Sequence, residues 1–218
     1  MIRRAALLAV LLLAAAPHAG ARAALSCPTP TPPAVAVSVE AGAPAIDNTL
    51  TQPALQQVAG TMPHGDLALG YYRANLEVRW RTFTAWRSAG TEACHWIERV
   101  AIEIALVDRK IYIIRERRPG SCPYDSVLGH ERKHQAVDDA VVAEYRPLLV
   151  RAAERAVAGL PPPTPDSIDR GDAVEARLTG TVETALQSIV KAMLAVRAAR
   201  QAAVDTPAEY RRIGAACG

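Results

Sequence analysis

The chain has 218 residues and a formal net charge of +3, a sign that is typical of proteins that bind nucleic acids or anionic surfaces. Arg3, Arg4 and Arg22 account for this excess, and all three precede Glu40, the first acidic residue of the chain. Because the remaining sequence is formally neutral and holds no aromatic RNA-binding motif, we exclude a nucleic-acid partner.

Residues 1–24 have the three parts of a secretory signal peptide. A short basic start precedes the apolar run 5–16, and Ala-Arg-Ala at 21–23 places small residues before a cleavage point. The apolar run is shorter than the roughly 20 residues of a membrane-spanning helix. We therefore expect an exported protein, periplasmic or secreted, without a transmembrane span. A lipid anchor at Cys27 is not expected, because Ala24 stands where a lipoprotein signal usually has leucine.

Residues 25–63 are rich in Pro, Ala and Thr and keep neither a helical nor a strand period. We predict an extended arm here, disordered over 28–45. All aromatic residues except Tyr210 lie between 65 and 150, which places the centre of the core in that region. The sequence from 64 to 218 is long enough for one domain with a core of its own.

Apolar residues alternate with polar and charged residues over about 76–84 and again over about 96–107. A further β-rich run follows over about 110–116. Asp108-Arg109-Lys110 separates the last two runs and predicts a hairpin turn. Together these strands predict a small antiparallel sheet.

Four cysteines in an exported protein indicate two disulfides. Cys94 and Cys122 lie about equally far from the predicted turn at 108–110. Residues equidistant from a turn face each other in an antiparallel hairpin. We therefore predict the pairs Cys94–Cys122 and Cys27–Cys217, the second of which would tie the arm to the C-terminus.

A helix is predicted over about 122–146, with Pro123 in its first turn and Pro147 kinking or ending it. A further helical stretch runs to the Pro-rich segment 161–165. From 172 onward the chain is helical again, with apolar residues at three- and four-residue spacing in an Ala-rich run.

A last short helix is expected after the capping box Thr206-Pro207-Ala208-Glu209. The predicted fold class is therefore α+β, with the antiparallel sheet packed on the helix at about 122–146 and followed by long C-terminal helices.

The run His130-Glu131-Arg132-Lys133-His134 is an H-E-x-x-H motif inside the predicted helix. Histidines four residues apart share a helix face, so His130 and His134 can bind one metal ion. Glu131 would lie beside that ion as the general base that takes a proton from a water molecule. Zinc is the expected metal, because it brings the pKa of a bound water toward about 7. The alternative is a solvated helix face with two exposed histidines.

Further features occur together outside the motif. They are a strand that begins Tyr-Tyr-Arg-Ala-Asn-Leu at 71–76, a hairpin bounded by cysteines, Gly-Ser-Cys-Pro-Tyr at 120–124, and Val-Asp-Thr-Pro-Ala-Glu-Tyr at 204–210 before Cys217. With the motif helix, they resemble zincin metallopeptidases, and in particular the bacterial secreted family of unknown function described as zinc-dependent proteases, over roughly 66–217. The resemblance implies a zincin-like domain and zinc-dependent hydrolysis, without a substrate.

Two departures from zincins stand out. The variable positions of the motif, usually uncharged, hold Arg132 and Lys133. The metzincin extension is absent, because Val137 and Ala140 stand where it requires glycine and histidine.

Asp205 is the preferred third metal ligand, because the long helix can return the chain to the core there and a bridge from Cys217 would hold it; the alternative is that Asp205 merely flanks a helix start. Asp205 also loosely resembles the downstream ligand of aspzincins. Glu154, 20 residues after His134, and Glu209, in the capping box, are the alternatives.

Asp138 is expected to accept a hydrogen bond from His134. His64 and His95 are further candidates without a spacing argument. Tyr145 and Tyr210 are candidate hydrogen-bond donors to an oxyanion, although either is more typical of a core.

The sequence thus supports two functions. One is a secreted or periplasmic zinc-dependent hydrolase, a peptidase that acts on a peptide or envelope substrate with Glu131 as general base. The other is a non-catalytic envelope or interaction protein on a zincin-like scaffold. An open cleft at the histidines favours the first, and a motif helix covered by the helix at 172–203 favours the second.

Overall fold

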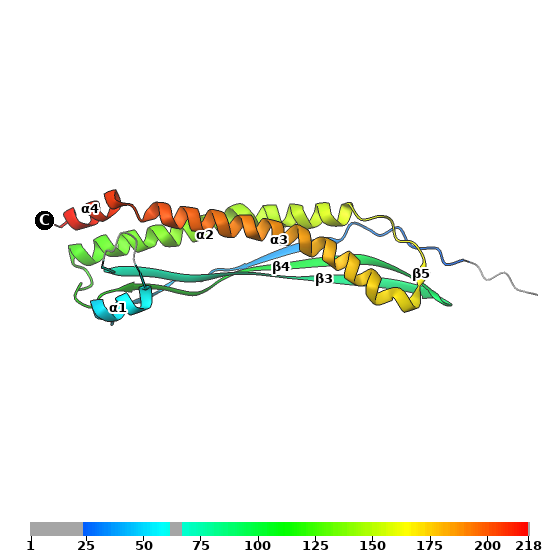
Figure 1. Cartoon of the computed structure of the whole chain (residues 1–218), viewed down its shortest axis with the longest axis horizontal. Coiled ribbons are helices and arrows are strands. Elements are labelled where there is room, and N and C mark those ends of the chain that lie inside the picture. The colour runs from blue at the N-terminus through cyan, green and yellow to red at the C-terminus, as the bar shows by residue number, and fades with distance from the viewer. Residues whose placement is uncertain (1–23, 62–66, 218) are drawn as a thin grey trace, which may run out of the picture.

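The structure is a computed structural model that describes residues 24–61 and 67–217. Most of the predicted signal peptide and His64 lie outside these ranges. The chain forms two N-terminal strands, a short helix and a long hairpin, followed by helices and one two-residue strand (Figure 1).

Strands β3 (Gly70–Ala89) and β4 (Glu92–Ile113) form one long antiparallel hairpin, which turns at residues 90–91. The predicted turn at 108–110 is wrong, because β4 runs straight through it. Asp108 lies there with a φ of 55° at a break in register opposite Ala74. The polar run therefore forms a β-bulge, which uses the same residue types as a turn.

The sheet is mixed and not the antiparallel sheet that was predicted. Strands β1 (Ala34–Glu40) and β2 (Ala45–Asp47) pair in parallel with β4, and β5 (Asp166–Ser167) pairs with it antiparallel. The expectation of disorder over 28–45 is also wrong. An alternating Ala-Val sequence forms β1 because β4 offers it a complete row of partners.

Helix α1 (Gln52–Ala59) follows β2, and the short 3-10 helix η2 (Ile168–Arg170) follows β5. Helices α3 (Gly171–Val204) and α4 (Pro207–Ala215) complete the chain. None of the helices in the described ranges combines the length and the apolarity that a bilayer crossing requires.

Helix α2 (Cys122–Ala158) continues through Pro147, so the predicted end near 146 is wrong. Proline removes the hydrogen bond to the carbonyl four residues earlier, at Ala143. Ala143 and Pro147 are both exposed, so water can bond the freed carbonyl and the helix can continue.

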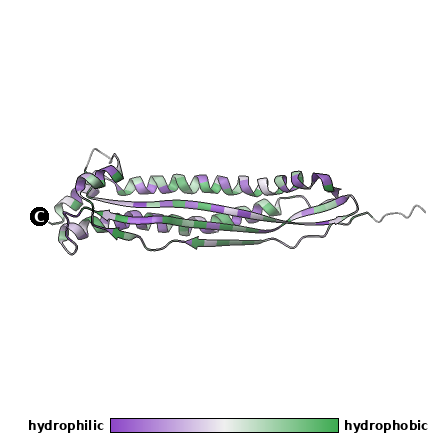
Figure 2. Ribbon diagram, turned by 90° about the horizontal axis from the view of Figure 1, so that it is seen from below, coloured by the Kyte–Doolittle hydropathy of each residue, from purple (hydrophilic) through white to green (hydrophobic). Residues whose placement is uncertain are grey.

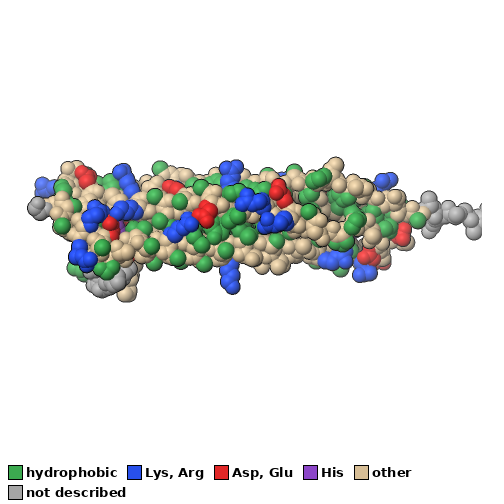
Figure 3. Space-filling model, turned by 90° about the horizontal axis from the view of Figure 1, so that it is seen from above, with side chains coloured by type: hydrophobic (Ala, Val, Ile, Leu, Met, Phe, Trp, Pro, Cys, Tyr) green, Lys and Arg blue, Asp and Glu red, His purple; other side chains and the backbone are tan. Residues whose placement is uncertain are grey.

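Helices α2 and α3 lie along one face of the elongated sheet (Figures 1 and 2). Buried residues of β4 alternate with outward residues and pack against both helices. The outer face of the molecule mixes basic and acidic side chains, as Figure 3 shows for one side. The main buried cluster includes Val100, Ile102, Ile104, Leu106, Val141, Leu149, Val182, Leu186 and Met193.

The disulfides join Cys27 to Cys94 and Cys122 to Cys217, so both predicted pairs are wrong. The misplaced turn is the cause. The true turn puts Cys94 opposite Arg87 near the hairpin tip, whereas Cys122 begins α2. Cys27, the residue considered above for a lipid anchor, is thus bonded to Cys94.

Candidate metal centre

The H-E-x-x-H residues lie in the N-terminal half of α2. Ser121 caps this helix through its hydroxyl, which accepts from the Tyr124 N–H at 3.4 Å, and proline follows in the first turn. One helical turn separates His130 from His134, and their Nε2 atoms lie 3.3 Å apart. The side chains of His130 and His134 are only 6% and 12% exposed, so the solvated helix face considered above is not found.

Asp205 ends α3 and lies against both histidines. Its Oδ1 atom is 3.3 Å from Nε2 of His130 and 3.2 Å from Nε2 of His134. Three donors bound tetrahedrally at about 2.0–2.1 Å would be about 3.3 Å from one another. The mutual distances of the three atoms are therefore compatible with their holding one metal ion together.

Hydrogen bonds keep Asp205 ionised. Burial alone would raise the pKa of its carboxyl, but hydrogen bonds from His130, His134 and the Tyr210 hydroxyl hold that pKa well below its usual range. Burial likewise opposes protonation of His134, yet the hydrogen bond to Asp205 and the nearby Glu131 raise the pKa of its imidazole. A bound cation would meet a carboxylate here and not a neutral acid.

Glu131 is 4% exposed and points toward β3. Burial raises the pKa of its carboxyl to about 7, although the two histidines oppose this, and the backbone N–H of Tyr72 donates to it. Gly70 makes the close approach possible, because a Cβ atom there would lie 2.5 Å from Glu131 Oε1 and 2.5 Å from a Val127 methyl.

Asp138 is fully buried and accepts four hydrogen bonds, but none comes from His134, so the predicted direct contact is wrong. Arg197 donates to it at 2.7 and 2.9 Å and Gln201 at 2.6 Å. Burial raises the pKa of Tyr72 to about 12, and its protonated hydroxyl donates to Asp138 at 3.1 Å. Gln201 Oε1 then lies 2.6 Å from Nδ1 of His134, so Asp138 acts on the histidine through this amide.

Glu209 lies on the other side of the site, in α4. Its Oε1 atom is 3.5 Å from Nδ1 of His130 and accepts from Lys133 Nζ at 2.5 Å. The unusual lysine in the motif is thus half-exposed and joins α2 to α4.

A cleft of about 490 Å³ opens beside His130, His134 and Asp205, the three candidate ligands. Although α3 covers part of α2, it does not close this cleft. Its walls are residues 70–75 of β3, the motif residues, and the C-terminal end of α3, and Ala59 and Thr61, at and just after the end of α1, also line it. The residues from α2 and the C-terminal end of α3 are His130, Glu131, His134, Leu194, Arg197, Ala198, Gln201 and Asp205.

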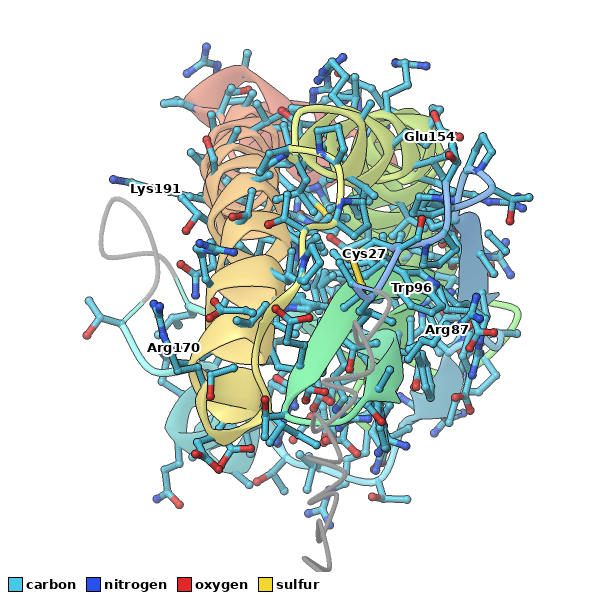
Figure 4. All side chains as sticks on the ribbon, turned by 90° about the vertical axis from the view of Figure 1, so that its right-hand side faces the viewer. Cys27, Arg87, Trp96, Glu154, Arg170 and Lys191 are labelled. Atoms are coloured by element: carbon cyan, nitrogen blue, oxygen red, sulfur yellow. A yellow bond between two sulfur atoms is a disulfide. The ribbon has the colours of Figure 1, made fainter. Side chains whose placement is uncertain are left out.

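The remaining candidates lie elsewhere. Glu154 is near the end of α2, at the end of the molecule that carries Cys27 and Trp96 (Figure 4), and lines a separate apolar cavity there. His95 lines the same cavity, 3.5 Å from Glu175. Tyr145 is buried in the main core.

The sequence analysis missed Gly70, Tyr72, Arg197 and Gln201. A signal was available for two of them. Arg197, Gln201 and Asp205 follow one another at four-residue spacing, so they form a polar row on one face of an Ala-rich helix. The roles of Gly70 and Tyr72 depend on where β3 meets α2 and leave no local pattern.

No protein-family model, curated protein or solved structure matches the chain.

Proposed function

We propose that the protein is an extracytoplasmic zinc-dependent hydrolase of the zincin type, most consistent with a peptidase. His130, His134 and Asp205 hold the metal in this proposal, and Glu131 is the general base. The proposal depends chiefly on one observation, the convergence of three donor atoms to mutual distances of 3.2–3.3 Å. Two disulfides and the signal-like N-terminus support the exported location.

The donor set favours zinc among the common metals. Two imidazole nitrogens and one carboxylate oxygen are a typical ligand set of catalytic zinc, with one position left for water or substrate. Zinc bound there would act as a Lewis acid that makes a coordinated water more acidic.

Glu131 is suited to move the proton of that water. A carboxyl with a pKa of about 7 can accept and release a proton near neutral pH, which matches the role of a general base that later acts as an acid. The N–H of Tyr72 holds this carboxylate in the wall of the cleft that also contains His130, His134 and Asp205.

The shape of the cleft supports a peptide substrate. In the described part of the chain, β3 pairs only with β4, and residues 70–75 of its other edge border the cleft. An extended peptide can bind such an edge through the main-chain groups that remain free, since the Tyr72 N–H already donates to Glu131 and the Ala74 carbonyl already accepts from Arg197.

Metal analysis of the purified mature protein tests the proposal. We expect one zinc per chain in the wild type and in Glu131→Ala, and loss of zinc in His130→Ala. Hydrolysis of a peptide mixture should be lost in both variants, because one removes the base and the other the metal. A wild-type protein without stoichiometric metal would refute the proposal.

The second candidate function is a non-catalytic envelope protein. The contact of His134 with both Asp205 and Gln201 favours it, because this hydrogen-bonded cluster needs no metal to be complete. In that case the wild type would hydrolyse no peptide, and Glu131→Ala would change the stability of the protein and not its function.

A further inference from the structure

One buried ring nitrogen of the candidate centre makes no hydrogen bond to the described residues. Nδ1 of His130 is buried and makes no hydrogen bond within the described residues. Nδ1 of His134, in contrast, is 2.6 Å from Gln201 Oε1. The nearest acidic group to His130 Nδ1 is Glu209, at 3.5 Å, just beyond a good hydrogen bond.

Binding of a metal through Nε2 of His130 would require a hydrogen-bond acceptor at Nδ1. The ring then carries its proton on Nδ1, and that N–H requires an acceptor that also fixes the orientation of the ring. Glu209 is the acidic side chain that faces this nitrogen, and its carboxylate already accepts hydrogen bonds from Lys133 and Arg212. Its side chain is 12% exposed, so water competes weakly for it.

Glu209 reaches His130 only because α4 is held against α2. Helix α4 has nine residues and none of them is fully buried, so apolar packing fixes it weakly. The Cys122–Cys217 disulfide joins Cys217, two residues after the end of α4, to Cys122, the first residue of α2. The ion pair of Lys133 with Glu209, the hydrogen bond from the Ser126 hydroxyl to the Ile213 carbonyl, and the packing of Ile213 on a buried cluster that includes residues of α2 add further links.

We infer that Glu209 is a positioning residue that orients His130 for metal binding, and that the Cys122–Cys217 disulfide holds it in place. This inference rests on the proposed metal site. It makes the affinity of the site for zinc depend on one particular disulfide, and therefore on an oxidising compartment.

Zinc affinity, measured by competition with a chromophoric chelator, tests the role of Glu209. We expect Glu209→Ala to lower the affinity about 10- to 100-fold with one zinc still bound at saturation. Glu209→Gln keeps an acceptor oxygen and should recover part of the loss. Glu144→Ala is the control, because it removes the acid of a different interhelical ion pair, with Arg200, and should leave the affinity unchanged.

The visible spectrum of the Co²⁺-substituted protein separates positioning from ligation. A positioning residue leaves the spectrum of the saturated site unchanged. Loss of stoichiometric binding or an altered spectrum in Glu209→Ala would make Glu209 a ligand and overturn the inference. An unchanged affinity in Glu209→Ala would overturn it as well.

The two disulfides provide the second comparison. Cys122→Ser/Cys217→Ser should lower zinc affinity to a similar extent as Glu209→Ala, whereas Cys27→Ser/Cys94→Ser, which opens a disulfide far from the site, should not. Equal losses in both double variants would mean general destabilisation and contradict the inference. If Cys122→Ser/Cys217→Ser does not fold, the Glu209 variants decide alone. A wild-type protein that binds no zinc would refute the proposed function itself, which is a different result.

Discussion

His130 and His134 are four residues apart in one helix, yet different elements hold them. Gln201 of α3 contacts Nδ1 of His134, and Glu209 of α4 faces Nδ1 of His130. The shared face of the two histidines follows from helix geometry alone, so the sequence predicts it. Their partners are more than 60 residues away along the chain, and no spacing rule reaches that far.

Glu131 makes the stability of the metal-free protein depend on pH. Its pKa is about 7 in the folded chain, against an ordinary value of 4.5. A raised pKa contributes stability that is complete below about pH 4.5 and is lost as the pH rises through about 7. The loss by pH 8 is roughly 3 kcal/mol.

Glu131→Gln should therefore be more stable than the wild type at pH 8 and differ little from it at pH 5. Urea unfolding of both proteins in the presence of a chelator measures this difference. His134 also has a raised pKa, so both proteins should lose some stability with rising pH. Identical pH profiles would show that the Glu131 carboxyl is not buried as the structure describes.

At the scale of elements, the helix starts were predictable and the helix and strand ends were less so. Ser121 and Thr206 cap α2 and α4 through their own hydroxyls, a signal contained within four residues. Pro147 resembles a helix end, but the helix continues because water can bond the carbonyl that the proline leaves free. The polar run at 108–110 resembles a turn, but the strand continues because β4 pairs with β3 on both sides of it.

Pro147→Ala should stabilise α2. The substitution adds an N–H that can donate to the Ala143 carbonyl, and alanine is the better helix former by about 3 kcal/mol in a helix interior. We expect a gain of about 1–3 kcal/mol in the free energy of unfolding, measured with urea. Pro123→Ala is the control, since proline in the first turn costs no hydrogen bond. Equal effects of the two substitutions would contradict this explanation.

At the scale of the whole molecule, each disulfide fastens a terminal segment to one end of an elongated body. Cys27–Cys94 fastens the arm near the hairpin tip, and Cys122–Cys217 fastens α4 beside the candidate metal centre. Strand β1 then extends along β4 from the first of these anchors.

Cys27→Ser/Cys94→Ser should destabilise the protein by about 4 kcal/mol, because the bond closes a loop with a sequence separation of 67. The amides of β1 should lose protection in hydrogen exchange more than those of α2, since β1 forms its backbone hydrogen bonds along one edge of β4 and lies closest to this disulfide in sequence. Uniform loss of protection over the chain would argue against a local role for this bond.

By itself, the sequence determined the features whose cause is local. These are the α+β content, the caps of the helices, the motif helix and the shared face of its histidines, all of which depend on residues within about one or two helical turns. Asp205 could be named as a candidate because the long helix returns the chain toward the motif.

Only the tertiary structure decided the strand order, the disulfide pairs and the contacts of Asp138, Gln201 and Glu209. Each of these depends on register along strands of about 20 residues, where one misplaced turn moves every later partner. The physical reason is that pairing and packing between distant segments are settled by their combined free energy over the whole sheet, and no short stretch of sequence contains that sum.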